Sequence, residues 1–343
     1  MPDPIVDTPV TLTKKDFASD QLVRWCPGCG DYAILSAVQA ALPELGQKKE
    51  DLVFVSGIGC SSRFPYYMST YGFHSIHGRA PAIAMGVKLA NPELSVWEIT
   101  GDGDAMAIGG NHFIHALRRN IDINILLFNN EIYGLTKGQY SPTSQTGLVT
   151  KSTPYGAVET PFLVGELALG AKASFFARTI DTNPKLMTKI FVESARFKGT
   201  SLIEILQNCV IFNDKVHGLI TNRETADDMQ LHLEHGQPMI FGKDKNKGIR
   251  LNGLKLEVVT IGENGITEND ILVHDAKEAD PTLHLMLVRM APPVFPMALG
   301  IIRAVETTTF GERLQIQKEE AVKKAKIRNM DELLNSGETW EIK

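Results

Sequence analysis

The sequence predicts an α/β fold in which helices cover both faces of a doubly wound parallel sheet, with an appendage at the C-terminal end. Short apolar runs alternate with helix-like segments between residues 30 and 207, and this alternation is typical of parallel sheets whose strands are joined by helices. Two of the runs end in polar turns, at 101–104 and 129–130. Ligands bind such sheets at the carboxyl ends of the strands, so these turns indicate a site.

Hydrophobic periodicity, glycine and proline define the elements of the main domain. Asn91-Pro92, for example, ends the helix before it, because proline disfavours a helical conformation in the preceding residue. The segment 134–153 is rich in Gly, Ser, Thr and Lys, a loop composition, and is long enough to be functional. The expected helices cover about 32–42, 77–90, 107–119, 161–169 and 184–197, and the expected strands cover about 52–56, 95–100, 123–128, 171–177 and 201–207.

The length of 343 residues exceeds the size at which a single core usually stops growing, so we expect one large domain with additions. The segment 1–20 is polar and reads as an arm on the surface or on a partner. The main domain should cover 21–215. The extension 216–343 begins where the chain becomes polar and charged.

The C-terminal extension carries no motif that can be assigned to chemistry. Two apolar segments, 254–261 and 283–290, are predicted to pair as strands. The stretch 292–303 should pack back on the main domain, and 310–328 should form a charged helix. Subunit contact, or cover for the cysteine site described below, is the expected role, and an inert solvated extension is the alternative.

Composition and charge exclude several classes of protein. With 43% hydrophobic and 22% charged residues, the chain is an ordinary globular protein. The net charge of −5 argues against nucleic acid or an anionic membrane as a partner. No apolar run approaches the roughly 20 residues that span a bilayer, and the N-terminus lacks the apolar core of a signal peptide. We therefore expect a cytoplasmic protein.

The two polar turns describe a site for Mg²⁺ and a diphosphate. One turn reads Gly101-Asp102-Gly103-Asp104 and the other Asn129-Asn130. Glycines let backbone N–H groups approach a phosphate closely, while the Asp102 carboxylate and the Asn130 amide oxygen are hard ligands that suit Mg²⁺. The Walker-type motif is absent, and the dinucleotide fingerprint fails because Met106 stands where its third glycine would be. For Gly-Asp-Gly alone, an ordinary strand-to-helix turn is the alternative.

The spacing of these turns resembles the cofactor motif of thiamine diphosphate enzymes. Asn130, the second Asn of the pair, follows Asp102 by 28 positions. The resemblance implies that Asp102, Asn130 and the main-chain carbonyl of Ile132 hold Mg²⁺, which neutralises the cofactor's diphosphate. It also implies that the cofactor is lined by Gly103, Asp104, Gly134 and Leu135.

All four cysteines fall in turns or at strand ends: Cys26, Cys29, Cys60 and Cys209. Buried structural cysteines would normally lie inside apolar strands, and disulfides are not expected because cytosolic thiols are kept reduced. The Cys-x-x-Cys turn presents two sulfurs toward one point. Four thiolates are the ligand set of a 4Fe-4S cluster or of a structural zinc, and their spacing does not separate the two.

Several short motifs occur together and in order. They are Cys26-Pro27-Gly28-Cys29-Gly30, Gly57-Ile58-Gly59-Cys60-Ser61, His77-Gly78-Arg79-Ala80, the Gly-Asp-Gly-Asp and Asn-Asn turns, and Tyr133-Gly134-Leu135-Thr136-Lys137-Gly138-Gln139. The set resembles the β subunits of 2-oxoacid:ferredoxin oxidoreductases, most closely the 2-oxoglutarate (KorB-type) enzymes. The resemblance covers about residues 20–215 and is far more specific than any single motif.

This resemblance implies roles for the cysteines and the turns around them. The four cysteines would bind one 4Fe-4S cluster, and His77 and Arg79 would lie near thiamine diphosphate. Family members often carry Pro-Cys where this chain has Asn208-Cys209, a departure that affects only the local backbone. The cofactor would also be contacted by Ile58, Gly59, Cys60 and Ser61.

The implied reaction is the CoA-dependent oxidative decarboxylation of a 2-oxoacid. Electrons would pass one at a time through the cluster to ferredoxin, and the reaction would be reversible in principle. In this superfamily a glutamate from a separate pyrimidine-binding domain activates the cofactor. We find no such domain in the sequence, so an α subunit should supply it in an αβ or (αβ)2 assembly.

Two cations follow the predicted cofactor turns, Arg63 and Lys137. A second carboxylate is costly to bury unpaired, and Arg grips a carboxylate with two donors while Lys acts as a point charge. We therefore predict that these residues act on 2-oxoglutarate, with succinyl-CoA as product. Solvated surface positions are the alternative for both.

Three other functions remain as alternatives. The first is an oxidoreductase of this kind that prefers pyruvate or accepts many 2-oxoacids. The second is a non-oxidative thiamine diphosphate decarboxylase or synthase subunit, which would have no use for four gathered cysteines. The third is a binding or regulatory subunit stabilised by zinc or a cluster, which would not need a Mg²⁺-diphosphate site.

Overall fold

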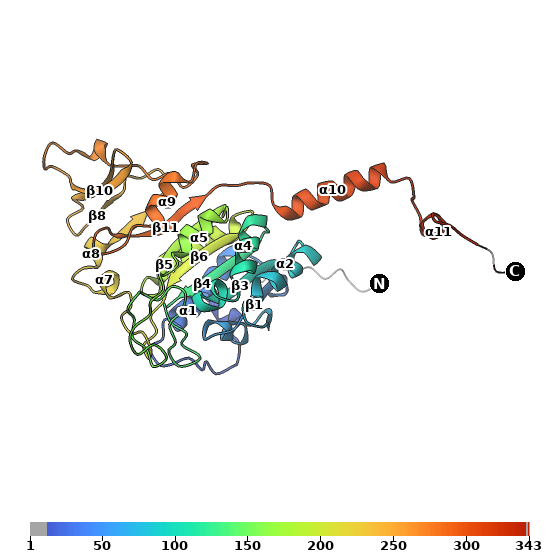
Figure 1. Cartoon of the computed structure of the whole chain (residues 1–343), viewed down its shortest axis with the longest axis horizontal. Coiled ribbons are helices and arrows are strands. Elements are labelled where there is room, and N and C mark those ends of the chain that lie inside the picture. The colour runs from blue at the N-terminus through green and yellow to red at the C-terminus, as the bar shows by residue number, and fades with distance from the viewer. Residues whose placement is uncertain (1–11, 341, 343) are drawn as a thin grey trace.

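The computed structural model describes residues 12–340 and 342. Its main body is an eight-stranded sheet with the order β2-β1-β3-β4-β6-β5-β11-β7, flanked by helices (Figure 1). Neighbouring strands are parallel except β11, which runs antiparallel to β5. The prediction of an α/β fold is confirmed. The strands are β1 Leu52–Ser56, β2 Tyr71–His74, β3 Ser95–Gly101, β4 Asn124–Asn129, β5 Phe175–Ile180, β6 Ser201–Leu206, β7 Gln230–Leu233 and β11 Met297–Ala304.

Each face of the sheet is covered by its own set of helices. Along β4, Ile125 and Leu127 belong to one apolar core, and Leu126 and Phe128 belong to the other, because successive side chains in a strand point to opposite faces. Helices α2 (Ala80–Ala90), α4 (Gly110–Arg119), α5 (Val164–Gly170) and α9 (Thr282–Val288) pack on the first core, and α1 (Asp31–Leu45) and α6 (Pro184–Arg196) pack on the second. Burial on both faces explains why the central strands are almost wholly apolar.

The strand register brings the predicted turns to one edge of the sheet. Ser56 pairs with Ile99, Gly101 with Phe128, and Asn129 with Leu206. Four central strands, β1, β3, β4 and β6, therefore end side by side. The Cys60 turn, the Gly-Asp-Gly-Asp turn, the Asn pair and the Cys209 turn all follow from these ends.

Two sequence predictions within the main domain are imprecise. The helix expected at 107–119 is α4, which starts later, at Gly110, and a separate short helix, α3 (Asp102–Met106), precedes it. The strand expected at 171–177 is β5, shifted toward the C-terminus, because Lys172 takes a left-handed turn with φ of 68° after α5. Strand β2 was not expected, since all four of its residues are exposed and show no apolar alternation.

The predicted strand pairing in the extension is wrong. Residues 283–288 lie in helix α9, and the leucines and methionines of the segment favour a helix more than β-branched residues would. Strand β10 (Lys255–Thr260) instead joins a small antiparallel sheet with β9 (Lys247–Asn252) and β8 (Ile240–Phe241). The stretch 292–303 does pack on the main domain, as strand β11 beside β5. Strands β7 and β11 thus extend the main sheet with residues from beyond 215.

The N-terminal end of the described chain buries an aromatic side chain, whereas the C-terminal helices bury none. Residues 1–11 of the expected arm lie outside the described residues, while a short 3-10 helix at Lys14–Phe17 buries Phe17 completely. At the other end, α10 (Phe310–Lys324) confirms most of the predicted charged helix and is followed by α11 (Met330–Leu334). Neither helix has a buried residue, and both extend away from the sheet (Figure 1).

The remaining short elements connect these parts. They are the 3-10 helices η2 Lys49–Asp51, η3 Ser61–Tyr67 and η4 Glu268–Asp270, and the helices α7 Gly218–Thr221 and α8 Ala226–Met229. In the part of the chain that the structure describes, no helix combines the length and apolarity needed to cross a bilayer.

Candidate functional site

The Cys-x-x-Cys turn is fixed against the end of strand β6. The Cys29 N–H donates to the Cys26 carbonyl at 3.0 Å, and the Gly30 N–H donates to the Asn208 carbonyl at 3.3 Å. Gly28 adopts φ of 84°, a conformation that favours glycine. Helix α1 starts directly after the turn. The first two cysteines are therefore held beside Cys209.

The other two cysteines face the same glycine. A Cβ atom placed on Gly134 would lie 3.5 Å from Cys60 Sγ and 3.6 Å from Cys209 Sγ, so these sulfurs are within about 7 Å of each other. The Trp25 indole N–H donates to the Cys60 carbonyl at 2.7 Å, which ties the Cys-x-x-Cys segment to the Cys60 turn. We call Cys26, Cys29, Cys60 and Cys209 the cysteine group.

Electrostatics shows that the members of the cysteine group lie close to one another. Burial raises the pKa of the Cys60 thiol to about 12, and the charges of Asp31, Cys209 and Cys26 add to the rise. Burial likewise raises the pKa of Cys29, together with the charges of Asp31, Cys60 and Cys209. All four thiols are free of disulfides, as expected. Without a bound cation to compensate their charge, the Cys29 and Cys60 thiols stay protonated.

Asp102 is a buried carboxylate that has no cationic partner among the residues that the structure describes. It opens helix α3 after strand β3 and is 3% exposed. Its Oδ2 accepts hydrogen bonds from Ser141 Oγ at 2.5 Å and Thr143 Oγ1 at 2.6 Å, both from the predicted functional loop. Burial nevertheless raises the Asp102 pKa to about 6, against the lowering effect of these hydroxyl groups. A divalent cation would supply the missing countercharge, so this carboxylate fits a Mg²⁺ ligand.

Asn130 and Ile132 lie on the neighbouring turn. The Ile132 N–H donates to Asn130 Oδ1 at 3.2 Å, and the Asn130 backbone carbonyl accepts from Asn213 Nδ2 at 3.0 Å. Because β3 and β4 are adjacent parallel strands, this turn and Asp102 share the same edge of the sheet. The three predicted Mg²⁺ ligands are thus of the right chemical kind and on adjoining turns.

Asp104 joins the turns around the site rather than presenting free oxygens. Its Oδ1 accepts from the backbone N–H groups of Ile58 at 3.1 Å and Gly78 at 2.8 Å, and its Oδ2 accepts from Thr100 Oγ1 at 2.9 Å. A Cβ atom on Gly57 would come within 1.8 Å of Asp104 Oδ2, which explains the glycine at that position. Asp104 therefore holds the turns after β1, β2 and β3 together.

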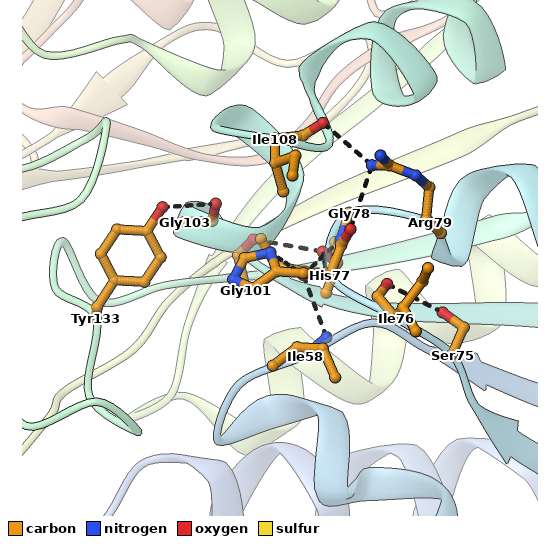
Figure 2. Close-up of polar contacts among 12 residues, drawn as sticks. Ile58, Ser75, Ile76, His77, Gly78, Arg79, Gly101, Gly103, Ile108 and Tyr133 are labelled. Carbon is orange, nitrogen blue, oxygen red and sulfur yellow. Dashed lines mark hydrogen bonds and ion pairs between the residues drawn. The ribbon is translucent and has the colours of Figure 1, made fainter.

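His77, Arg79 and Tyr133 surround this junction. Figure 2 shows Tyr133 and Arg79 on opposite sides of His77 and Gly78. His77 Nδ1 lies 2.9 Å from Asp104 Oδ1, although without hydrogen-bond geometry. Arg79 donates to the carbonyl of His77 at 3.2 Å, and the Tyr133 hydroxyl donates to the Gly103 carbonyl at 3.0 Å. A Cβ atom on Gly103 would reach within 2.3 Å of the Tyr133 ring.

The remaining predicted residues lie in the Cys60 turn and in the loop after the Asn pair. Ser61 is 5% exposed, and its Oγ would be 3.6 Å from a Cβ atom on Gly101. Gly59, Arg63 and Leu135 line one cavity of about 540 Å³. Lys137 is exposed, has φ of 77°, and is not among the residues that line this cavity.

Gln207 links the Asn130 turn to the cysteine group and was missed by sequence reasoning. Its Oε1 accepts from Asn130 Nδ2 at 2.8 Å, and its Nε2 donates to Cys29 Sγ at 3.3 Å. The side chain is 1% exposed. The available signal was its position at the end of a strand, two residues before Cys209.

Two buried carboxyl groups behind the cysteine group were also missed. Burial raises the Asp31 pKa to about 7, and nearby Asp181 adds to this rise while a hydrogen bond with the Cys29 side chain opposes it. Asp181 Oδ2 accepts from the Asn208 N–H at 2.8 Å. Nothing in the local pattern distinguishes these residues from ordinary helix-start and turn aspartates.

Comparison with known proteins identifies the family. Residues 57–205 match the family model described as thiamine pyrophosphate enzyme, C-terminal TPP binding domain. The chain is 49% identical over 331 residues to 2-oxoglutarate oxidoreductase subunit KorB of Mycobacterium tuberculosis, covering 96% of this chain and 88% of that protein. It is 46% identical over 185 residues to 2-oxoglutarate synthase subunit KorB of Archaeoglobus fulgidus, covering 54% of this chain and 69% of that protein.

A solved structure agrees with these relatives. It is 2-oxoglutarate:ferredoxin oxidoreductase from Magnetococcus marinus with 2-oxoglutarate, coenzyme A and succinyl-CoA bound. The TM-score is 0.77 at 29% identity, and the match covers 96% of this chain and 97% of that chain. Together with the thiamine-enzyme match and the turns gathered at one sheet edge, these similarities show that the chain belongs to the KorB family of 2-oxoglutarate oxidoreductase subunits.

Proposed function

We propose that this chain is the β subunit of a 2-oxoglutarate:ferredoxin oxidoreductase. With CoA, the enzyme converts 2-oxoglutarate into succinyl-CoA and CO₂, and electrons leave one at a time through a 4Fe-4S cluster to ferredoxin. The observation that carries the proposal is the contact of one side chain, Gln207, with both the Asn130 turn and the cysteine group. A cofactor and an electron acceptor bound this close together can exchange electrons.

Thiamine diphosphate and Mg²⁺ are the proposed cofactors of the Asp102 turn. When bound, thiamine diphosphate supplies the electron sink for the decarboxylation. Asp102, Asn130 and the Ile132 carbonyl would hold Mg²⁺, while the junction around Asp104 keeps the turns beneath the diphosphate in place. The buried, unpaired Asp102 carboxylate is the best support for a cation there.

A 4Fe-4S cluster fits the cysteine group better than zinc does. Zinc binds each sulfur at about 2.3 Å in a tetrahedron, so all its ligands must converge on one point. Among residues 12–340 and 342, no three His, Cys, Asp or Glu side chains are gathered as a single ion requires. A cluster of four irons and four sulfides is a larger body, and its four thiolate ligands stand farther apart.

An α subunit is proposed as the obligatory partner. The family model matched by residues 57–205 is the C-terminal TPP binding domain, which supports a separate source for the pyrimidine-binding domain and its activating glutamate. An αβ or (αβ)2 assembly in the cytoplasm would then be the working enzyme. Arg63 and Lys137 are proposed to act on the substrate, and of these Arg63 lines the cavity beside the Cys60 turn.

Co-purification of the chain with its α subunit, under anaerobic conditions, tests the proposal. We expect a brown protein with four irons per αβ unit that reduces an acceptor dye with 2-oxoglutarate and CoA. Pyruvate and 2-oxobutyrate serve as comparison substrates. A colourless protein that contains zinc would refute the redox function, and a preference for pyruvate would refute the substrate assignment.

A further inference from the structure

The cavity beside the Cys60 turn carries more positive charge than sequence reasoning assigned to it. It holds about 540 Å³, and its lining includes Arg24, Arg63 and His74 but no Asp or Glu. Among the described residues, neither arginine is in an ion pair. Two unpaired guanidinium groups in one cavity repel each other, and a bound anion would relieve that repulsion.

Arg24 and Arg63 reach this cavity from different parts of the chain. Arg63 lies in the short helix η3 directly after Cys60. The Arg24 N–H donates to the Tyr67 hydroxyl at 2.9 Å, and the Trp25 indole donates to the Cys60 carbonyl at 2.7 Å. These two bonds fasten the irregular segment before the Cys-x-x-Cys turn onto η3 and the Cys60 residue that precedes it. They use the Arg24 backbone and leave its side chain available.

The rest of the lining includes residues of the two turns that are proposed to contact the cofactor. These residues are Gly59 and Leu135. Leu135, 45% exposed, offers apolar surface for methylene groups. Tyr66 also lines the cavity, and its ring centroid lies 6.1 Å from that of His74. One cavity thus combines apolar surface with cationic side chains.

We propose that Arg24 acts with Arg63 to bind the second carboxylate of a 2-oxo diacid, so that Arg24 is a specificity-determining residue. The inference rests on the proposed function and refines its substrate site. Guanidinium groups bind carboxylates through paired, charge-assisted hydrogen bonds. Pyruvate ends in a methyl group and would leave both cations unpaired. Lys137 does not line the cavity, so Arg24 is the residue assigned beside Arg63 within it.

Kinetics of the co-purified αβ complex tests the role of Arg24. In Arg24→Gln we expect kcat/KM for 2-oxoglutarate to fall by about tenfold or more, the usual worth of a hydrogen bond to a charged group, and to fall much less for pyruvate. For Arg24→Lys, kcat/KM for 2-oxoglutarate should lie between the values of wild type and Arg24→Gln. Lysine keeps the positive charge but lacks the paired donors of a guanidinium group. Arg118→Gln, a change at an exposed position on α4 outside the cavity, is the matched control.

Other kinetic outcomes would overturn the inference. Equal losses for 2-oxoglutarate and pyruvate would assign Arg24 to their shared carboxylate or to the cofactor. A rise only in KM for CoA would mean that the cavity holds a CoA phosphate. A larger loss of diacid preference in Lys137→Gln than in Arg24→Gln would make Lys137 the second cation.

Binding of unreactive acids separates this inference from the proposed function. Glutarate has two carboxylates and butyrate has one, and Trp25, next to Arg24, is a fluorescent reporter close to the cavity. We expect glutarate to bind the wild-type complex more tightly than butyrate, and Arg24→Gln to remove the difference. If the complex turned over no 2-oxoacid while this pattern held, the proposed function would fail and the anion site would stand. Equal glutarate binding by wild type and Arg24→Gln would overturn the site.

Discussion

Asp102→Asn should stabilise the cofactor-free protein while it abolishes binding of the cofactor. Burial raises the Asp102 pKa to about 6 from the ordinary 3.8. Between these two values the folded state holds a proton that the unfolded chain has released, so the free energy of unfolding falls as the pH rises across this window. At one pKa unit per 1.36 kcal/mol, the penalty above pH 6 is about 3 kcal/mol.

The asparagine side chain removes this penalty without removing the site's hydrogen bonds. Its amide oxygen can accept from Ser141 and Thr143 as the carboxylate does, and it carries no charge to desolvate. Without cofactor at pH 8, the variant should therefore unfold several degrees above wild type. At pH 4, where Asp102 is protonated in the folded state, the difference should largely vanish.

With thiamine diphosphate and Mg²⁺ added, wild type should become more stable to heat than Asp102→Asn. Ligand at about 100 times its Kd stabilises the folded state by about 2.7 kcal/mol, and only wild type should gain this, since the variant has lost the charged Mg²⁺ ligand. Thermal unfolding of the co-purified complex, with EDTA or with cofactor, measures both effects. Asp51→Asn, at an exposed position in η2, is the control. A variant that gains as much from the cofactor as wild type would remove Asp102 from the metal site.

Three further changes test other parts of the structure. Cys209→Ser should lower iron content or cluster stability while thiamine diphosphate still binds, and full iron with unchanged electron transfer would exclude this ligand. Gln207→Leu should shift the cluster's midpoint potential, measured by a redox titration followed by EPR. The Gln207 amide nitrogen lies 3.3 Å from Cys29 Sγ, and hydrogen bonds to the sulfurs change the reduction potential of iron–sulfur centres. An unchanged potential would show that this contact has no electronic role. Burial, with the charge of Arg303, lowers the His284 pKa below its ordinary 6.5, so the unfolded chain binds the proton more readily and the protein loses stability as the pH falls below about 6.5. In His284→Gln, the free energy of unfolding should depend less on pH below about 6.5 than it does in wild type. An unchanged pH dependence would contradict the role given to His284.

Much of the fold could be predicted because its signals are local. The strand at 52–56 and the helix starting at Pro184 were predicted with bounds close to those observed, since apolar runs and a proline at a helix start depend only on neighbouring residues. The segment 283–290 failed for the complementary reason. A short apolar run fits a strand or a buried helix equally well, and packing decides which one forms.

The chemical groups at the strand ends could be predicted from local sequence: the Asp102 turn, the Asn pair and the cysteines. These are properties of single turns, where glycine, aspartate and cysteine have specific uses. Which of these groups lie together depends on the tertiary structure. Gln207 contacts Asn130 because β4 and β6 are neighbours in register, and Arg24 joins Arg63 because two hydrogen bonds fasten distant segments together. Such contacts depend on strand order and long-range packing, which leave no periodic trace in the residues on either side.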